Sequence, residues 1–345
     1  MSAPIISALG ASAGGIEALK IFFEHTPADS GLAYVVLLHL SPDHDSRLAN
    51  VLQQATNMPV QQVKDKTRIE ADKVYVISPN EHLVLEDGYI IPTPNRNIEE
   101  RRAPVDIFFR HLADVHGNRA IAVVLSGTGA DGSMGLKRVK EYGGAVLVQN
   151  PREAEFNEMP RNAIATGLVD AVLNVADMPA YIIAYCQTLQ ETQYAEVPEP
   201  DEPVNQQALR DIFIQLRQRT GHDFSNYKRA TLLRRIGRRM AVQGLASLPG
   251  YAAYASEHPA ETQAQVKDLL ISVTNFFRDK TPFDYLETEI LPQLFADKGM
   301  EDQVRIWVAG CACHRRRSLY TGHAVRRAHH WHFRCTQGAN LCHRY

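Results

Sequence analysis

The amino-acid sequence predicts an α/β protein in which a doubly wound, mostly parallel sheet is followed by a small all-α domain. Short apolar runs alternate with segments of helical periodicity over residues 1–190, which favours parallel strands covered by helices on both faces. Residues 191–205 hold three prolines and five acidic groups and are typical of a solvated linker. Residues 206–300 then follow a helical pattern, and residues 301–312 contain one more apolar strand.

The expected elements of the first half follow one another in strand and helix order. A strand at 4–10 ends in glycine and leads through a Gly/Ala/Ser turn into a helix at 16–24. The later elements are strand 33–40, helix 46–55, strand 73–78, a hairpin at 82–92 around Asp87-Gly88, helix 105–115, strand 120–126, helix 134–142 and strand 145–150. In open parallel sheets, functional sites lie beyond the carboxyl ends of the strands, so we expect the catalytic or binding residues at those ends.

The overall composition excludes several classes of protein. The chain has 345 residues, a net charge of −2 and 45% apolar residues, so it resembles an ordinary globular protein without a general attraction to nucleic acid. It contains no run of roughly 18 apolar residues, and its N-terminus lacks the pattern of a signal peptide. We therefore expect a cytoplasmic protein with reduced thiols, no nucleic-acid partner and no direct membrane insertion.

Three strand ends carry residues suited to nucleophilic catalysis. Ser12 lies in GASAGG, which matches the G-x-S-x-G elbow that exposes a serine hydroxyl between a strand and a helix. His39 ends the second strand, and Asp131 follows the strand 120–126 in GTGADG. A weak hydroxyl nucleophile needs a base, and the base needs an orienting carboxylate. The three residues together therefore predict a serine hydrolase site.

Two alternatives use the same residues. An α/β-hydrolase would order its triad Ser, Asp, His, whereas this chain runs Ser, His, Asp. The GTGADG segment also satisfies the dinucleotide-binding pattern G-x-G-x-x-G, but the next strand ends in Gln149-Asn150 and not in an acidic residue. Dinucleotide binding stays open as an alternative, as does a scaffold that only holds its partners.

Four blocks of the first half resemble the catalytic domain of the chemotaxis protein-glutamate methylesterases (CheB-type). They are GASAGGIEAL, LLHLSPDHDS, LSGTGADGSMG and QNPREAEFNEMPRNAI, and they occur in the family's order. The resemblance implies that Ser12 is the nucleophile, His39 the general base and Asp131 the residue that orients it. It also implies that backbone amides, at Ala13 and Thr128, bind the oxyanion, although many members have threonine where Ala13 stands.

The resemblance implies hydrolysis of glutamate γ-methyl esters on methylated chemoreceptor helices, in some members with glutamine deamidation, and no cofactor or metal for the esterase. Family members often carry an N-terminal receiver domain. The first expected strand starts near Pro4, so we expect no such domain here.

The second half resembles the start of the chemotaxis receptor methyltransferases (CheR-type), with TNFFRD as its most specific block and RIWVAGCA as the start of a Rossmann-like sheet. The resemblance implies contacts of Thr274 and Arg278 with S-adenosylmethionine. A helix in this half has an apolar stripe opposite four arginines, Arg234, Arg235, Arg238 and Arg239. The arginines are expected either to form a solvated face or, as the resemblance implies, to dock acidic receptor helices.

The segment after Ala312 departs from that pattern. Residues 312–325 can be encoded so that a frame shifted by one nucleotide reads ATGEEAYTLAML, the continuation that the resemblance implies. We therefore expect a frameshift near residue 313, a disordered out-of-frame tail over 313–345, and a truncated, inactive methyltransferase.

A zinc module is the alternative for the end of the chain. Residues 311–345 hold six of the fourteen histidines and four of the five cysteines, namely Cys311, Cys313, Cys335 and Cys342. Thiolates and imidazoles are suitable zinc ligands, yet none of these cysteines forms a C-x₂-C pair, and finger spacing is absent. We therefore expect no metal site, and we interpret the chain as an esterase joined to a truncated methyltransferase.

Overall fold

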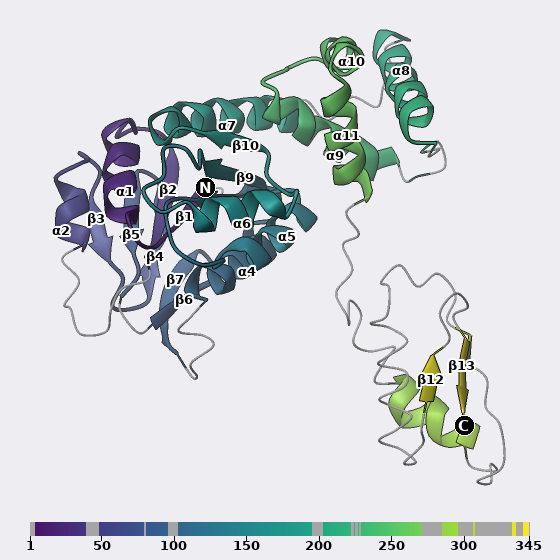
Figure 1. Cartoon of the computed structure of the whole chain (residues 1–345), viewed down its shortest axis with the longest axis horizontal. Helices are drawn as coiled ribbons and strands as arrows, with labels where there is room; N and C mark the ends of the chain where they lie inside the picture. Colours follow the sequence, from purple (N-terminus) through teal and green to yellow (C-terminus); the bar gives the residue numbers. More distant parts are fainter. Residues whose placement is uncertain are drawn as a thin grey trace. The chain divides into compact units, whose positions relative to one another are not determined.

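The computed structural model (Figure 1) divides into two compact units, residues 1–271 and 272–345. The structure describes residues 4–38, 48–78, 81–95, 103–194, 203–221, 224, 227, 229–270, 285–295, 306–307, 333–335 and 341–344. Within the first unit, residues 4–194 form a domain built on a parallel sheet, the sheet domain, and residues 203–270 form a domain of helices, the helical domain.

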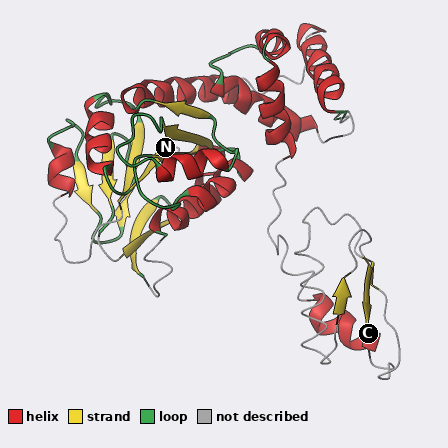
Figure 2. Cartoon of the chain, in the orientation of Figure 1, coloured by secondary structure: helices red, strands yellow, loops and turns green. Residues whose placement is uncertain are grey.

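The sheet domain is built on seven strands that all run parallel, which confirms the predicted fold class (Figure 2). Their order is β10-β9-β8-β1-β2-β5-β3. The strands are β1 (Ile5–Ala11), β2 (Leu32–Leu38), β3 (Val60–Gln62), β5 (Lys73–Val76), β8 (Ala120–Val124), β9 (Ala145–Gln149) and β10 (Ala171–Leu173). The chain first builds outward from β1 through β2 and then returns to β1's other side with β8, so the strand order reverses beside β1. Ligands of doubly wound sheets bind at such a reversal.

Two layers of helices cover the sheet because successive side chains of each strand face opposite sides. On one side, Leu9 and Val36 pack with Phe22 of α1 (Gly15–Glu24), and α2 (Leu48–Gln53) and α7 (Met178–Tyr194) complete the layer. On the other side, Ala8 and Val35 pack with Phe109 of α4 (Pro104–His116). That layer also contains α5 (Ser133–Glu141) and α6 (Glu158–Ala165). The sheet domain also has two short 3₁₀ turns, at Gly117–Arg119 and Val175–Asp177.

A small antiparallel sheet, ordered β4-β7-β6, adjoins this second layer. It consists of β4 (Thr67–Arg68), β6 (Glu81–Glu86) and β7 (Tyr89–Pro94). Asp87 and Gly88 connect β6 to β7 with φ angles of 48° and 80°. Two consecutive positive φ angles are what a two-residue hairpin turn requires, so the predicted hairpin is present.

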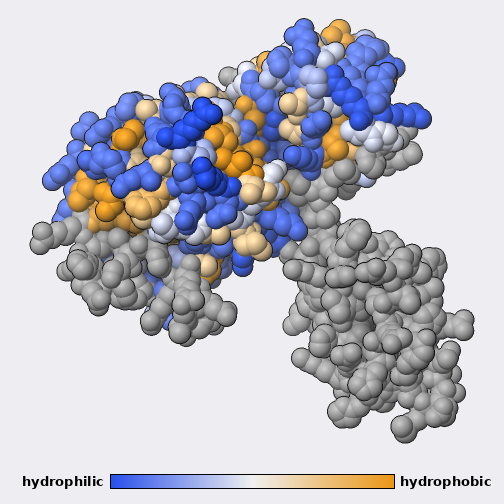
Figure 3. Space-filling model, in the orientation of Figure 1, coloured by the Kyte–Doolittle hydropathy of each residue, from blue (hydrophilic) through white to orange (hydrophobic). Residues whose placement is uncertain are grey.

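The helical domain contains α8 (Pro203–Thr220), α9 (Arg229–Val242), α10 (Leu248–Glu257) and α11 (Pro259–Leu270). Its core joins the predicted apolar stripe of α9 to side chains of α8 and to Tyr251 of α10. On the face drawn in Figure 3, hydrophilic residues predominate over this domain. Because α7 continues to Tyr194 and α8 begins at Pro203, helices occupy both ends of the segment 191–205 that the sequence predicts as a linker. None of the described helices has the length and apolar character needed to cross a membrane.

The expectation that the four arginines of α9 form one solvated or freely docking face is wrong. Arg234 is exposed, but Arg235, Arg238 and Arg239 are 7%, 4% and 4% exposed. Carboxylates distant in the sequence surround Arg238 and Arg239, and a buried guanidinium is tolerated when it is paired in this way.

The second unit contains a π-helical segment (Leu286–Ile290), α13 (Leu291–Phe295), β11 (Ile306–Trp307), β12 (Phe333–Cys335) and β13 (Leu341–Arg344). The strand β13 pairs antiparallel with both β11 and β12. The tail 313–345, expected to be disordered, therefore contributes two short strands among the described residues. A Rossmann-like start at 304–311 and the frameshift stay predictions.

Candidate active site

The predicted nucleophile Ser12 lies in a tight turn between β1 and α1. Gly15 N donates a hydrogen bond to Ser12 O at 2.9 Å, and Gly14 has a φ of +69°. A side chain at position 14 would be strained by that φ and would approach Ser126 Oγ to 2.7 Å. Ser12 is half-buried at the carboxyl end of β1. This is the geometry that the G-x-S-x-G pattern predicts.

The loop that follows β8 lies directly against this turn. Ser12 N donates to Ser126 O at 3.0 Å, and Leu125 N donates to Gly10 O at 2.9 Å. A Cβ at Gly127 would lie 2.9 Å from Ser12 Cβ and 2.0 Å from Met159 Sδ. Glycine at the start of GTGADG is therefore required by the close approach of the nucleophile.

Ser126 connects three loops of the site, and the sequence did not point to it. Its hydroxyl donates to Ala13 O at 2.9 Å and accepts from Phe156 N at 3.0 Å. Its amide donates to Gln149 Oε1 at 2.7 Å, and both Ser126 and Gln149 are nearly inaccessible to solvent. The available sequence signals were a serine directly before G-x-G and a glutamine at the end of a buried strand.

The two amides predicted to bind an oxyanion belong to residues near Ser126, because Ala13 O accepts the Ser126 hydroxyl and Thr128 follows two residues later. Among the described residues, neither Ala13 N nor Thr128 N has a hydrogen-bond acceptor. The amides on either side of Thr128 are occupied, because Gly127 N donates to Phe156 O at 2.9 Å and Gly129 N donates to a carboxylate oxygen of Glu158 at 2.8 Å. These two bonds hold the Thr128 peptide in place.

The contact with Glu158 also argues against dinucleotide binding. A phosphate in a G-x-G-x-x-G loop is held by backbone amides at the following helix N-terminus. Here a carboxylate already accepts from Gly129 N, and Asn162 Nδ2 donates to Gly129 O at 2.7 Å. The Glu158 side chain of α6 thus occupies a backbone amide that a pyrophosphate would need.

Asp131 belongs to the same loop, and its carboxylate caps α4. Oδ1 accepts from Asp106 N and Gly132 N, both at 2.9 Å, and Oδ2 accepts from Val105 N at 3.1 Å. Burial raises the pKa of Asp131 to about 6, although these backbone hydrogen bonds act in the opposite direction. Burial also raises the pKa of the neighbouring Asp106 carboxyl group, which accepts from Gly135 N at 2.6 Å. The sequence did not predict this capping role.

The structure thus brings Ser12 together with the loop that carries Thr128 and Asp131. His39 follows β2, whose last residue, Leu38, is paired with Ala11 of β1, but His39 itself lies outside the described residues. Thr274 and Arg278, predicted to contact S-adenosylmethionine, also lie outside them. The roles of all these residues stay predictions.

Comparison with known proteins identifies two families on this chain. The description "CheB methylesterase" matches residues 7–182, and "CheR methyltransferase, all-alpha domain" matches residues 207–270. The crystal structure of the Thermotoga maritima CheB methylesterase catalytic domain superposes with a TM-score of 0.50 at 27% identity, over 53% of this chain and 98% of that one.

Curated relatives are similar to the same parts of this chain. An uncharacterized 104.1 kDa protein of Rhodobacter capsulatus is 34% identical over 77% of this chain, which spans 30% of that relative's length. A putative protein-glutamate methylesterase/protein-glutamine glutaminase of Leptospira interrogans is 34% identical over 48% of this chain and 87% of its own length. The chain therefore belongs to the CheB methylesterase family, and the all-alpha domain of the CheR methyltransferases follows on the same chain.

Proposed function

We propose that this chain hydrolyses γ-methyl esters of glutamate side chains on methylated chemoreceptor-type proteins in the cytoplasm. The observation that carries the proposal is the position of Ser12 in a tight turn at the strand-order reversal, directly against the GTGADG loop, in a member of the CheB methylesterase family. Relatives carry the name protein-glutamate methylesterase/protein-glutamine glutaminase.

In the proposed reaction, Ser12 Oγ attacks the ester carbonyl carbon while His39 accepts the hydroxyl proton. The resulting oxyanion accepts hydrogen bonds from the amides of Ala13 and Thr128. His39 then returns the proton to the departing methoxide, which leaves as methanol. A water molecule, deprotonated by His39, hydrolyses the acyl-enzyme and restores the Ser12 hydroxyl.

Two features of the structure support the roles of His39 and Asp131. Because Ala11 is paired with Leu38, Ser12 and His39 each follow directly after paired strand residues. Asp131 Oδ2 accepts one amide hydrogen bond, whereas Oδ1 accepts two. A carboxylate oxygen has two lone pairs, so Oδ2 retains one for an imidazole N–H.

Methanol release from a methylated receptor fragment tests the proposal. The full chain should release methanol, Ser12→Ala should release none, and Ser7→Ala should retain activity because Ser7 is buried inside β1. If the unaltered chain binds the fragment but releases no methanol, the chain is a scaffold and the proposal is wrong. Glutamine side chains can form the same acyl-enzyme with loss of ammonia, so ammonia release from the unmethylated fragment tests the second reaction.

A further inference from the structure

The arginine helix α9 packs on the sheet domain through side chains of both domains. Tyr181 of α7 donates its hydroxyl to Val242 O at 3.0 Å. Ala241 and Val242 are 2% and 6% exposed and belong to the hydrophobic core that α1 and α7 form on the sheet. The contact joins residues from regions that match two different families, so neither family by itself describes it.

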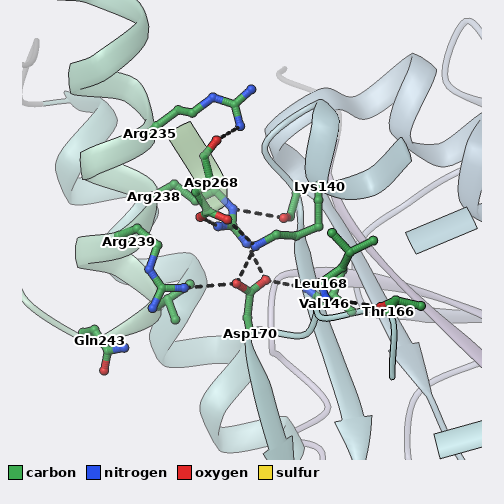
Figure 4. Close-up of polar contacts among 12 residues, drawn as sticks. Lys140, Val146, Thr166, Leu168, Asp170, Arg235, Arg238, Arg239, Gln243 and Asp268 are labelled. Carbon is green, nitrogen blue, oxygen red and sulfur yellow. Dashed lines mark hydrogen bonds and ion pairs between the residues drawn. The ribbon is translucent and has the colours of Figure 1, made fainter. Parts of the chain in front are cut away.

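Figure 4 shows a cluster of buried charges formed by residues of the same two domains. Asp170, which precedes β10, is its centre. The Asp170 carboxylate accepts from Lys140 Nζ at 2.7 Å, from Arg239 at 3.3 Å and from Val146 N at 2.9 Å, and it also pairs with Arg238. Arg238 Nε donates to Gly144 O at 3.1 Å. The two arginines of α9 thus bind a carboxylate and a carbonyl of the sheet domain.

Carboxylates of α11 complete the cluster. Asp268 pairs with Arg238 and with Lys140 Nζ at 2.9 Å, and Glu261 pairs with Arg239 at 2.5 Å. The three cations and three carboxylates are each at most 5% exposed in their side chains. These six charges balance one another in a buried region, and the buried Arg235 adjoins them by donating to Asp268 O at 2.7 Å.

Such a cluster makes each member depend on the others. Removal of one partner leaves another charge buried and uncompensated, which costs more than an exposed ion pair contributes. Burial alone would raise the pKa of Asp170, but Arg238, Lys140 and Arg239 outweigh it and hold the pKa well below its usual range. The carboxylate thus stays ionised and keeps both arginines of α9 engaged.

The contact lies away from the candidate active site. Lys140 is in the last turn of α5, Gly144 precedes β9 and Asp170 precedes β10, so the cluster lies at the amino ends of these strands. Ser12 follows the carboxyl end of β1, and all seven strands are parallel. The cluster lies at the amino ends of the parallel strands, and the nucleophile lies at their carboxyl ends.

We propose that the surface formed by Lys140, Gly144 and Asp170 is a docking site for the arginine pair of α9. The contact fixes the helical domain to the sheet domain and makes Arg238 and Arg239 inaccessible to acidic partners. Arg234, which is exposed on the same helix, stays available to them. The inference does not rest on the esterase activity.

Hydrogen exchange and poly-L-glutamate binding by the full chain test the proposal, with Asp170→Asn as the main variant. This substitution keeps the size of the side chain but removes the sheet-domain carboxylate that pairs with Arg238 and Arg239, while Asp268 and Glu261 of α11 still pair with them. We expect exchange to become roughly tenfold faster in α9 and in the amino end of β9 together, because the two surfaces separate. We also expect binding of poly-L-glutamate to become severalfold tighter at low salt, since two guanidinium groups lose the sheet-domain carboxylate and become accessible, although Asp268 and Glu261 still pair with them.

Two further variants serve as matched controls. Arg234→Gln should weaken poly-L-glutamate binding of the otherwise unaltered chain without changing hydrogen exchange, because Arg234 is exposed. Arg238→Met keeps much of the side-chain volume and opens the contact from the other side, so it should accelerate exchange at the amino end of β9 even where the Asp170 variant folds poorly. If Arg238→Met weakens poly-L-glutamate binding as much as Arg234→Gln and leaves exchange unchanged, the arginines are not withheld and the proposal is wrong.

Discussion

Replacement of Ser126 by alanine is the most direct probe of how the candidate active site is held together. The change removes one oxygen atom that serves two loops: it donates to Ala13 O at 2.9 Å and accepts from Phe156 N at 3.0 Å. The backbone bond between Ser12 N and Ser126 O does not depend on the side chain. The nucleophile should therefore stay close to its position while the Ala13–Gly14 peptide, which adjoins the predicted oxyanion amide of Ala13, loses its support.

The expected magnitude follows from these contacts. Each lost hydrogen bond costs about 1 kcal/mol net, so the free energy of unfolding should fall by about 2 kcal/mol. Loss of an oxyanion donor typically lowers kcat by about 10²–10³-fold. Because the Ala13 amide would be displaced and not removed, we expect kcat for methanol release to fall by roughly 10- to 100-fold with KM almost unchanged.

The assay compares kcat, KM and urea unfolding of the unaltered chain, Ser126→Ala and Ser7→Ala. Ser7 is a matched control because it is also fully buried, lies on β1 and has a hydroxyl without a hydrogen-bond partner among the described residues. Its removal should leave both kcat and stability nearly unchanged. A Ser126→Ala protein that is less stable but keeps kcat within about twofold would refute the positioning argument, since only a structural role would remain.

Three further predictions concern single residues. Gly127→Ala should abolish methanol release, measured beside a circular dichroism check of folding, because the added Cβ would lie 2.9 Å from Ser12 Cβ; retained activity would contradict the close approach. Gly237→Ala, inside α9 with open space around it, should raise the free energy of unfolding in urea by about 0.5–1 kcal/mol, and a loss of stability would contradict this. The pKa of Asp131 is about 6 in the folded chain and 3.8 ordinarily, so the folded chain binds this proton more tightly than the unfolded chain does. The contribution of Asp131 to the free energy of unfolding therefore falls by about 3 kcal/mol as pH rises from 3.8 to about 6. The stability difference between the unaltered chain and Asp131→Asn should show this slope, and kcat should rise through about pH 6 as the carboxylate ionises.

The sequence was sufficient to predict the elements whose signals are local. The apolar runs predicted β1, β2, β8 and β9, and the Asp87-Gly88 pair predicted the hairpin turn because few other residues accept two positive φ angles. The short strands β3 and β10 have only three residues each, too few for an alternating pattern to be recognised. Their place in the sheet depends on pairing with β5 and β9, which is not a local property.

The partners of the charged residues could not be predicted from the sequence for the same reason, as the arginines of α9 show. Periodicity correctly placed Ile236 and Met240 in the core of the helical domain. It could not identify the partner of Arg238, because Asp170 lies 68 residues earlier in the chain. The capping of α4 by Asp131 was missed for the same reason, since the acceptor and the helix N-terminus are separated by 25 residues. Contacts of this kind follow from the tertiary fold.

The short outer strands have a consequence for how molecules of this protein meet one another. A sheet edge presents unpaired N–H and C=O groups that can template pairing with a second sheet, and short or charged edges prevent this. The two edges of the parallel sheet are β3 and β10, three residues each, and Asp170 adjoins β10 with its amide already bonded to Val146 O. Neither edge strand has enough consecutive residues to pair stably with a second sheet. The unpaired edges of the sheet domain are therefore protected against aggregation.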